Sequence, residues 1–220
     1  VWEGDGVSMM LLLAAKADIK AKNGHDDDVV HIAAWNGHAA CLQLLLDAGA
    51  YIKNKNKGGN NPLHLAVLKG HTACAQLLLA AKAHARTKNS EGYDSLHLAA
   101  MQGHTDCVQL LLSLKRNVKP YINAETSAGL TGLYLSVCGD HAECTQLLLD
   151  AKAPLEAKDN QGLTALSRAA LNGSAACLRL LIHAKAAIES HDEIRRTALS
   201  FAALKGHTAC AQLLIDAKAA

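Results

Sequence analysis

Apolar residues along the chain gather in two alternating kinds of cluster, and together these clusters predict pairs of short helices. One kind follows a polar residue and contains Leu-His-Leu-Ala, as in residues 61–66 and 94–99. The other kind ends in a leucine triplet, as in residues 44–46 and 77–79. Such clusters are typical of helices with one buried face. A mostly polar stretch of about ten residues separates each pair from the next.

The two clusters recur with a fixed period, which six of the seven cysteines mark. These cysteines are Cys41, Cys74, Cys107, Cys144, Cys177 and Cys210. The spacing is 33 residues within each group of three and 37 residues between the groups, which indicates about four inserted residues near Arg116–Lys119. Self-similarity at such a period predicts a repeat architecture, in which each unit buries its apolar face against its neighbours.

Residues 61–66 read Asn-Pro-Leu-His-Leu-Ala, and a Gly-His pair and a leucine triplet follow at residues 70–71 and 77–79. This order resembles the ankyrin repeat, with its Thr-Pro-Leu-His-x-Ala, Gly-His and leucine signature, and the resemblance covers essentially the whole chain. It implies an all-α ankyrin-repeat solenoid of about six to seven stacked helix-turn-helix units with short β-hairpin loops, called fingers below. The first unit is incomplete.

The resemblance also sets the expected organisation, a single ankyrin-repeat domain over residues 1–220. Its expected repeats are 1–22 (partial), 23–55, 56–88, 89–125 (with the insertion), 126–158, 159–191 and 192–220. Because the last unit has no obvious polar cap, we expect a monomeric array that is part of a longer chain. The fourth complete unit, at residues 126–158, is irregular, with Tyr134 where histidine is usual, Ser136 for alanine and Asp140 for glycine.

Residues with special backbone roles recur in phase with the repeat. Helix-capping residues open the first helices: Asp28, Asn61, Asp94, Thr131, Thr164 and Thr197. Glycines, which tolerate left-handed backbone, mark the turns between helices: Gly37, Gly70, Gly103, Gly173 and Gly206. After the second helices the family usually has glycine, but here lysine is the rule: Lys16, Lys82, Lys115, Lys152, Lys185 and Lys218. We expect these lysines to be left-handed.

Composition narrows the class of protein. Half of the residues are apolar, only 3% are aromatic, and the formal net charge is +2. These values argue against a disordered chain and against nucleic-acid binding. The longest apolar run, residues 9–15, is too short to span a membrane, so no membrane insertion is expected. Reduced cysteines and the lack of a secretory-signal pattern favour the cytoplasm or nucleus.

The chain shows no catalytic motif, and we expect no enzyme activity, cofactor or metal site. It has no phosphate-binding glycine loop, nucleophile elbow or Cys-x-x-Cys pair. Histidines recur one repeat apart, as in His31 and His64, and therefore cannot converge on one ion. We interpret them as structural, with the imidazole of this motif bonded to neighbouring backbone, and we interpret the repeated cysteines as buried small apolar residues.

Two features predict a surface for a partner protein. The residue two places before each inter-helix turn is apolar, forming the row Trp2, Trp35, Leu68, Met101, Cys138, Leu171 and Leu204. This row is either an exposed interaction stripe or packs against neighbouring first helices. The N-terminal fingers are basic through Lys53, Lys55, Lys57, Arg86 and Lys88, whereas the last finger is acidic through Glu189, Asp192 and Glu193.

The sequence thus predicts a scaffold or adaptor that binds another protein with apolar and acidic side chains. The candidate contact residues are Trp35, Leu68, Tyr93, Met101, Leu171, Leu204, Lys57, Lys69 and Lys88. Tyr93 is included as an exposed aromatic at a fingertip. The alternative is a regulatory or targeting domain of a larger enzyme, such as a ubiquitin ligase adaptor, a phosphatase subunit or an acyltransferase. The irregular fourth unit counts against an engineered consensus array.

Overall fold

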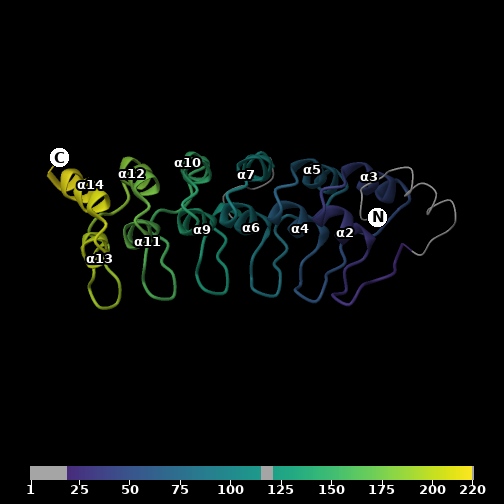
Figure 1. Cartoon of the computed structure of the whole chain (residues 1–220), viewed down its shortest axis with the longest axis horizontal. Coiled ribbons are helices and arrows are strands. Elements are labelled where there is room, and N and C mark those ends of the chain that lie inside the picture. The colour runs from purple at the N-terminus through teal and green to yellow at the C-terminus, as the bar shows by residue number, and fades with distance from the viewer. Residues whose placement is uncertain (1–18, 115–120, 220) are drawn as a thin grey trace. The chain divides into compact units, whose positions relative to one another are not determined.

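A computed structural model describes residues 19–114 and 121–219, in which every regular element is an α-helix and no strand is formed (Figure 1). The chain divides into two compact units, with the division between Ala99 and Ala100. Unit 1 contains α2 (Val29–Trp35), α3 (Ala39–Asp47), α4 (Pro62–Leu68) and α5 (Thr72–Ala80). α6 (Ser95–Met101) includes the division. Unit 2 contains α7 (Thr105–Leu112), α9 (Gly132–Cys138), α10 (Ala142–Asp150), α11 (Ala165–Asn172), α12 (Ala175–His183), α13 (Ala198–Lys205) and α14 (Thr208–Ala219).

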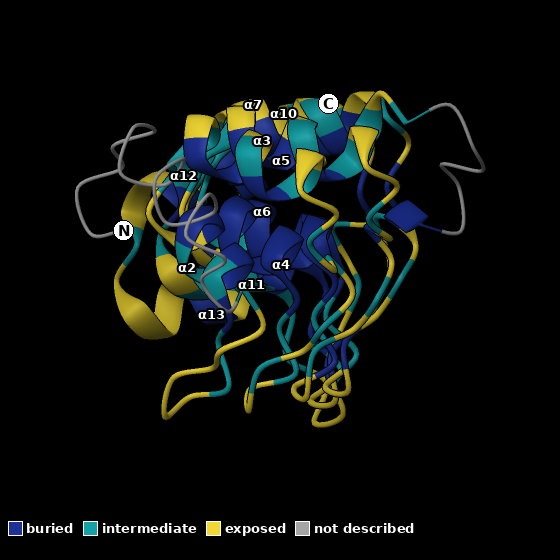
Figure 2. Cartoon of the chain, turned by 90° about the vertical axis from the view of Figure 1, so that its right-hand side faces the viewer, coloured by how far each residue is buried: buried dark blue, intermediate teal, exposed yellow. Residues whose placement is uncertain are grey.

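Within each unit the helices pack as hairpin pairs in two layers. In unit 1, α2 packs on α3 and α4, while α5 packs on α3 and α4. In unit 2 the first helices α9, α11 and α13 follow one another, and the second helices α10, α12 and α14 form the other layer. The helices are buried where they face one another, and the fingertips are exposed (Figure 2). The predicted all-α repeat stack is therefore confirmed.

The first helices begin where the capping residues predict. Asp28 Oδ1 accepts hydrogen bonds from the backbone N–H groups of Val30 (3.0 Å) and His31 (3.1 Å). The other five caps accept in the same way: Asn61, Asp94, Thr131, Thr164 and Thr197. These bonds satisfy N–H groups that have no partner inside the helix.

Left-handed residues close the turns as expected, with one exception. The five turn glycines have φ between 72° and 79°, and Asp140 takes the same conformation with φ 56°. Lys82, Lys152 and Lys185 are left-handed, with φ of 66°, 67° and 69°. The expectation was wrong for Lys218, because α14 continues through it to Ala219 without a turn. Lys16 and Lys115 lie outside the described residues, as does the insertion near Arg116–Lys119.

The fingers differ from the expected β-hairpins, since the described residues contain one isolated bridge, between His191 and Thr197, and no strand. Each finger is closed instead by one side chain whose oxygen accepts from the backbone N–H groups two and four residues further on. The closing residues are Asn23, Asn56, Asn89, Thr126, Asp159 and Asp192. Because these N–H groups bond to a side chain, they are not available for a strand ladder.

The core consists of small and branched apolar residues contributed by both layers. On α3, Cys41, Leu42 and Leu45 have no exposed surface, and the corresponding residues Cys177, Leu178 and Leu181 of α12 have none either. None of the seven cysteines forms a disulfide, and all except Cys138 are buried, as predicted. Burial raises the pKa of the Cys74 and Cys177 thiols to about 11, so both stay protonated near neutral pH.

Candidate functional site

The predicted apolar row lies at the C-terminal ends of the first helices, and no member in the described residues is buried. In unit 1, Trp35 ends α2 with 41% of its surface exposed, and Leu68, at the end of α4, is half-buried. In unit 2, Met101 and Leu171 are half-buried, Cys138 is exposed, and Leu204 is 67% exposed. Trp2 lies outside the described residues.

Trp35 and Lys69 form the most distinctive contact on this row. The Lys69 ammonium nitrogen lies 4.0 Å from the centroid of the Trp35 ring, within the range of a cation–π interaction. Lys69 follows α4 directly as its C-cap residue, so one repeat places its cation over the aromatic ring of the preceding repeat. Both predicted site residues are exposed and therefore accessible to a partner.

Histidines of the second helices fix the backbone beneath the row. In unit 1, His71 Nε2 lies 3.1 Å from the carbonyl oxygen of Trp35. In unit 2, His141 and His207 make the same contact, at 3.2 Å, with the carbonyl oxygens of Met101 and Leu171. The preceding turn needs glycine for this contact as well as for its φ, since a Cβ at Gly37 would lie 2.5 Å from the His71 ring. The sequence located these histidines but not this role.

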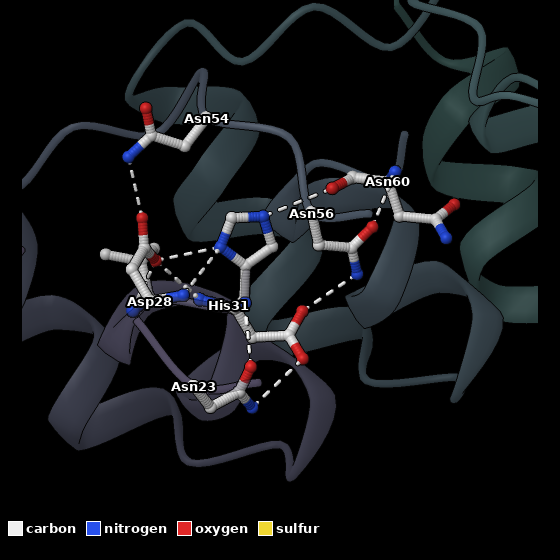
Figure 3. Close-up of polar contacts among 8 residues, drawn as sticks. Asn23, Asp28, His31, Asn54, Asn56 and Asn60 are labelled. Atoms are coloured by element: carbon white, nitrogen blue, oxygen red, sulfur yellow. Dashed lines mark hydrogen bonds and ion pairs between the residues drawn. The ribbon is translucent and has the colours of Figure 1, made fainter. Parts of the chain in front are cut away.

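The other histidine set has the predicted structural role (Figure 3). His31 Nδ1 lies 2.8 Å from Asp28 Oδ1, and its Nε2 lies 3.1 Å from the backbone oxygen of Asn60. Burial raises the pKa of the Asp28 carboxyl, but hydrogen bonds from His31 and from Asn54, at 2.7 Å, outweigh this effect. The net pKa of Asp28 is therefore below its ordinary value. No group of histidine, cysteine and acidic residues suited to a metal is found among the described residues.

The basic fingers of unit 1 partly use their lysines to hold neighbouring fingers. Lys55 Nζ donates to the backbone oxygen of Lys88 at 2.8 Å, and Lys57 Nζ donates to that of Gly24 at 2.7 Å. Each of these lysines is exposed, as is Lys53. The charge therefore stays on the surface while carbonyl groups position it.

One expectation about the fingers was wrong. Tyr93 is half-buried, with its ring edge-on to His97 at 6.3 Å between centroids, whereas Tyr51 is the exposed tyrosine of unit 1, at 60%. In the last finger, two of the three acidic residues are paired with basic side chains. Asp192 is 4% exposed and pairs with Arg196 at 2.7 Å, and Glu189 pairs with Lys218 at 2.8 Å.

The irregular fourth repeat contains a polar cluster that sequence reasoning missed. Tyr134 replaces the motif histidine, and its buried hydroxyl donates to Asp159 Oδ2 and accepts from Arg168 Nε at 2.6 Å. Arg168 also pairs with Asp159 at 3.2 Å. Burial raises the pKa of the Asp159 carboxyl, but hydrogen bonds from Tyr134 and from the Leu163 backbone N–H outweigh this and leave its pKa below the ordinary value. The sequence did contain an indication of this cluster, because Arg168 occupies a first-helix position that is apolar in the other repeats.

A second exchange in the same repeat lies in the core. Ser136, which replaces alanine, has its hydroxyl 2.9 Å from that of Thr145 on α10. Because each hydroxyl has one proton, one of the two donates to the other, while the second donates to a backbone oxygen, that of Leu133 for Ser136 or that of His141 for Thr145. The Ser136 and Thr145 hydroxyls, both fully buried, are therefore satisfied inside unit 2 and form no accessible polar site.

Comparison with known proteins agrees with this geometry. A family model for ankyrin repeats in three copies matches residues 3–89, 30–123 and 96–192, and the chain therefore belongs to the ankyrin-repeat family. Ankyrin repeats generally act as protein–protein interaction modules. No curated protein matches the chain in sequence.

Solved structures show the same fold. The human ASB11 ankyrin repeat domain aligns with a TM-score of 0.85 at 24% identity, covering 98% of this chain and 94% of that one. An ankyrin repeat domain from Acinetobacter baumannii AYE aligns with a TM-score of 0.76 at 23% identity, covering 86% and 97%. The ankyrin repeat domain of Bcl-3, described as a member of the IkappaB family, aligns with a TM-score of 0.78 at 26% identity, covering 89% of this chain and 87% of that one.

Among the described helices, none combines the length and the apolar character that a membrane-spanning helix needs.

Proposed function

We propose that the chain is a scaffold or adaptor in which compact unit 1, residues 1–99, binds a partner protein through Trp35 and Lys69. The observation that supports this most is the exposed indole with an ammonium group 4.0 Å from its ring centroid. Tryptophan is enriched among the residues that dominate binding energy in protein interfaces. His71 also holds the backbone from which the ring projects, through the carbonyl group of Trp35.

Lys69 specifies the chemistry of the partner. Among the described residues no carboxylate forms an ion pair with its ammonium group. An incoming carboxylate could therefore bond to the ammonium while an adjacent apolar side chain packs on Trp35 and half-buried Leu68. This pairing fits a partner segment that carries acidic and apolar residues.

The fingers of unit 1 extend the same preference. Lys57 and Lys88 add exposed positive charge, and Tyr93 contributes a half-buried ring below them. Charges of this kind mainly speed and orient association, and salt weakens their effect. In unit 2, Met101 and Leu171 offer a separate, apolar surface, and Leu204 is its most exposed member.

The proposed role is binding without catalysis. The sequence also raised the alternative that the chain is a regulatory or targeting domain of a larger enzyme. The proposed role includes this alternative, because such a domain also acts by binding. Seven cysteines without a disulfide, six of them buried, support residence in the cytoplasm or nucleus.

The test is a quantitative pull-down with the intact chain and with the double variant Trp35→Ser/Lys69→Gln. A matched control is Tyr51→Ser, which removes an even more exposed aromatic side chain from the same unit. We expect the double variant to keep its thermal stability and to lose at least about tenfold in the affinity of captured partners, as for loss of an interface anchor. Equal capture by the double variant and the intact chain would refute the proposal.

A further inference from the structure

Unit 2 contains a surface cavity of about 390 Å³ that includes no residue of the apolar row. It lies between the C-terminal halves of α10 and α12, which pack side by side (Figure 1), and the loop that follows α10. Its apolar walls include Leu149, which is 9% exposed, and the half-buried Leu155 and Leu180. The cavity is within the size range of small-molecule sites, about 300–1,000 Å³.

The polar groups at the edge of this cavity are mainly basic. Lys152, from the loop, and His183, from the last turn of α12, both line it and are both exposed. Asp150 lines it too, but its Oδ1 accepts a hydrogen bond from Gln146 Nε2 at 2.8 Å. The same glutamine–aspartate bond occurs in α3 and in α14, at 2.7 Å, so it is a general feature of these second helices.

α12 departs from the repeat at the two positions of this bond. Arg179 occupies the position at which the other complete repeats have glutamine: Gln43, Gln76, Gln109, Gln146 and Gln212. His183 occupies the position at which three of them have aspartate: Asp47, Asp150 and Asp216. Residues four apart share one face of a helix, and both side chains are exposed. The α12 side of the cavity therefore has two basic side chains and no carboxylate at these positions.

The three basic side chains are not neutralised by the acidic groups of the described chain. None of the carboxylates there forms an ion pair with any of the three. Glu156, which follows the loop, accepts instead from the backbone N–H of Ala187 at 2.8 Å and from the hydroxyl of Ser190 at 3.0 Å. Apolar walls with a positive edge are complementary to an apolar molecule that carries a negative charge.

We propose that this cavity binds a small carboxylate with an apolar body, such as an aromatic or short aliphatic acid. The apolar body packs between Leu149 and Leu180, and the carboxylate accepts from the Lys152 ammonium group and from the His183 ring. Arg179 attracts the anion from the same side of the cavity. This site and its ligand are additional to the partner-binding role proposed for unit 1.

The test uses two probes of one shape, the anion 2-naphthoate and its neutral amide, 2-naphthamide. Each probe is titrated into the full chain, and the broadening of its own NMR signals gives the Kd. We expect saturable binding of 2-naphthoate and binding of 2-naphthamide that is weaker by about threefold or more, since an exposed ion pair changes affinity a few-fold. Added salt should reduce this difference, because it screens the ion pair.

Two lysine variants separate the cavity from the general charge of the chain. Lys152→Gly removes a cation that lines the cavity, and Lys185→Gly removes an equally exposed cation outside it. Both lysines are left-handed, with φ of 67° and 69°, so both replacements relieve the same strain and should leave the chain folded. We expect Lys152→Gly to weaken 2-naphthoate binding by about threefold and Lys185→Gly to leave it unchanged.

A further variant, Arg179→Gln/His183→Asp, restores the residues typical of the repeat and should also weaken 2-naphthoate binding. Three outcomes would overturn the proposal: no saturable binding of 2-naphthoate at millimolar concentration, equal affinity for the two probes, or equal effects of the two lysine variants. None of these results bears on capture through Trp35 and Lys69, so the two proposals fail separately.

Discussion

Removing one hydroxyl group from the irregular fourth repeat should destabilise the protein measurably. Tyr134→Phe deletes the group that donates to Asp159 and accepts from Arg168, while the ring that fills the core stays in place. Tyr134 is 2% exposed and Asp159 is 9% exposed, so water cannot readily replace the lost bond. Arg168 remains bonded to Asp159 at 3.2 Å and retains part of the cluster.

The expected loss is about 2 kcal/mol in the free energy of unfolding, since hydrogen bonds to charged groups contribute roughly 1.5–3 kcal/mol. In a chain of this length the apparent Tm should fall by about 4–8 °C. Urea unfolding followed by circular dichroism at neutral pH measures the free energy of unfolding, and a thermal scan measures the apparent Tm.

The pH dependence separates this cluster from a simple packing defect. The pKa of Asp159 is lower in the folded chain than its ordinary value of 3.8. The Asp159 carboxylate therefore contributes fully to the free energy of unfolding above pH 3.8, and this contribution is lost as the pH falls through the pKa of the folded state. Because Tyr134→Phe removes one cause of the depression, the difference between variant and parent should shrink below pH 3.8.

Tyr93→Phe is the matched control, because Tyr93 is half-buried and its hydroxyl makes no hydrogen bond within the described residues. Its effect should stay within about 0.5 kcal/mol. If Tyr134→Phe were equally mild, or equally severe at neutral and acidic pH, the account of the cluster would be wrong.

Further substitutions test the turns and the buried histidines. Lys152→Gly should stabilise by about 0.5–1 kcal/mol, because φ is 67° there, and a loss of stability in urea unfolding would contradict the strain argument. Gly173→Ala should cost about 1 kcal/mol more than Gly206→Ala, since both strain the backbone but only the first displaces His207. Burial lowers the pKa of His64 to about 4 from 6.5, so the unfolded chain takes up the extra proton between these values. Stability should therefore fall by up to about 3 kcal/mol on acidification through this range, and pH-dependent urea unfolding of His64→Gln should show a shallower slope than the parent.

Much of the fold could be predicted from the sequence because its determinants are local. A capping side chain such as Asp28 acts on N–H groups two and three residues away, and a left-handed turn needs a residue such as Gly37 at one position. Both signals recur in every repeat, which makes them easy to recognise. The left-handed lysines were also located correctly at Lys82 and Lys152, although nothing in the structure explains the choice of lysine there.

The remainder depends on contacts between repeats, which local sequence does not display. The exposure of Tyr51 and the partial burial of Tyr93 depend on the folded chain, in which the Tyr93 ring lies edge-on to His97. The Tyr134 cluster joins residues 25 and 34 positions apart, so its members look like separate irregularities until the fold brings them together. The cation over Trp35 likewise comes from the next repeat.

Tryptophan fluorescence tests the central claim most directly. In a Trp2→Phe variant, Trp35 is the sole tryptophan and reports on the proposed contact surface. On titration with a purified captured partner, the account predicts a blue shift of the emission and a clear loss of quenching by acrylamide, because the 41% exposed indole becomes covered. Saturable binding with unchanged emission and quenching would contradict it.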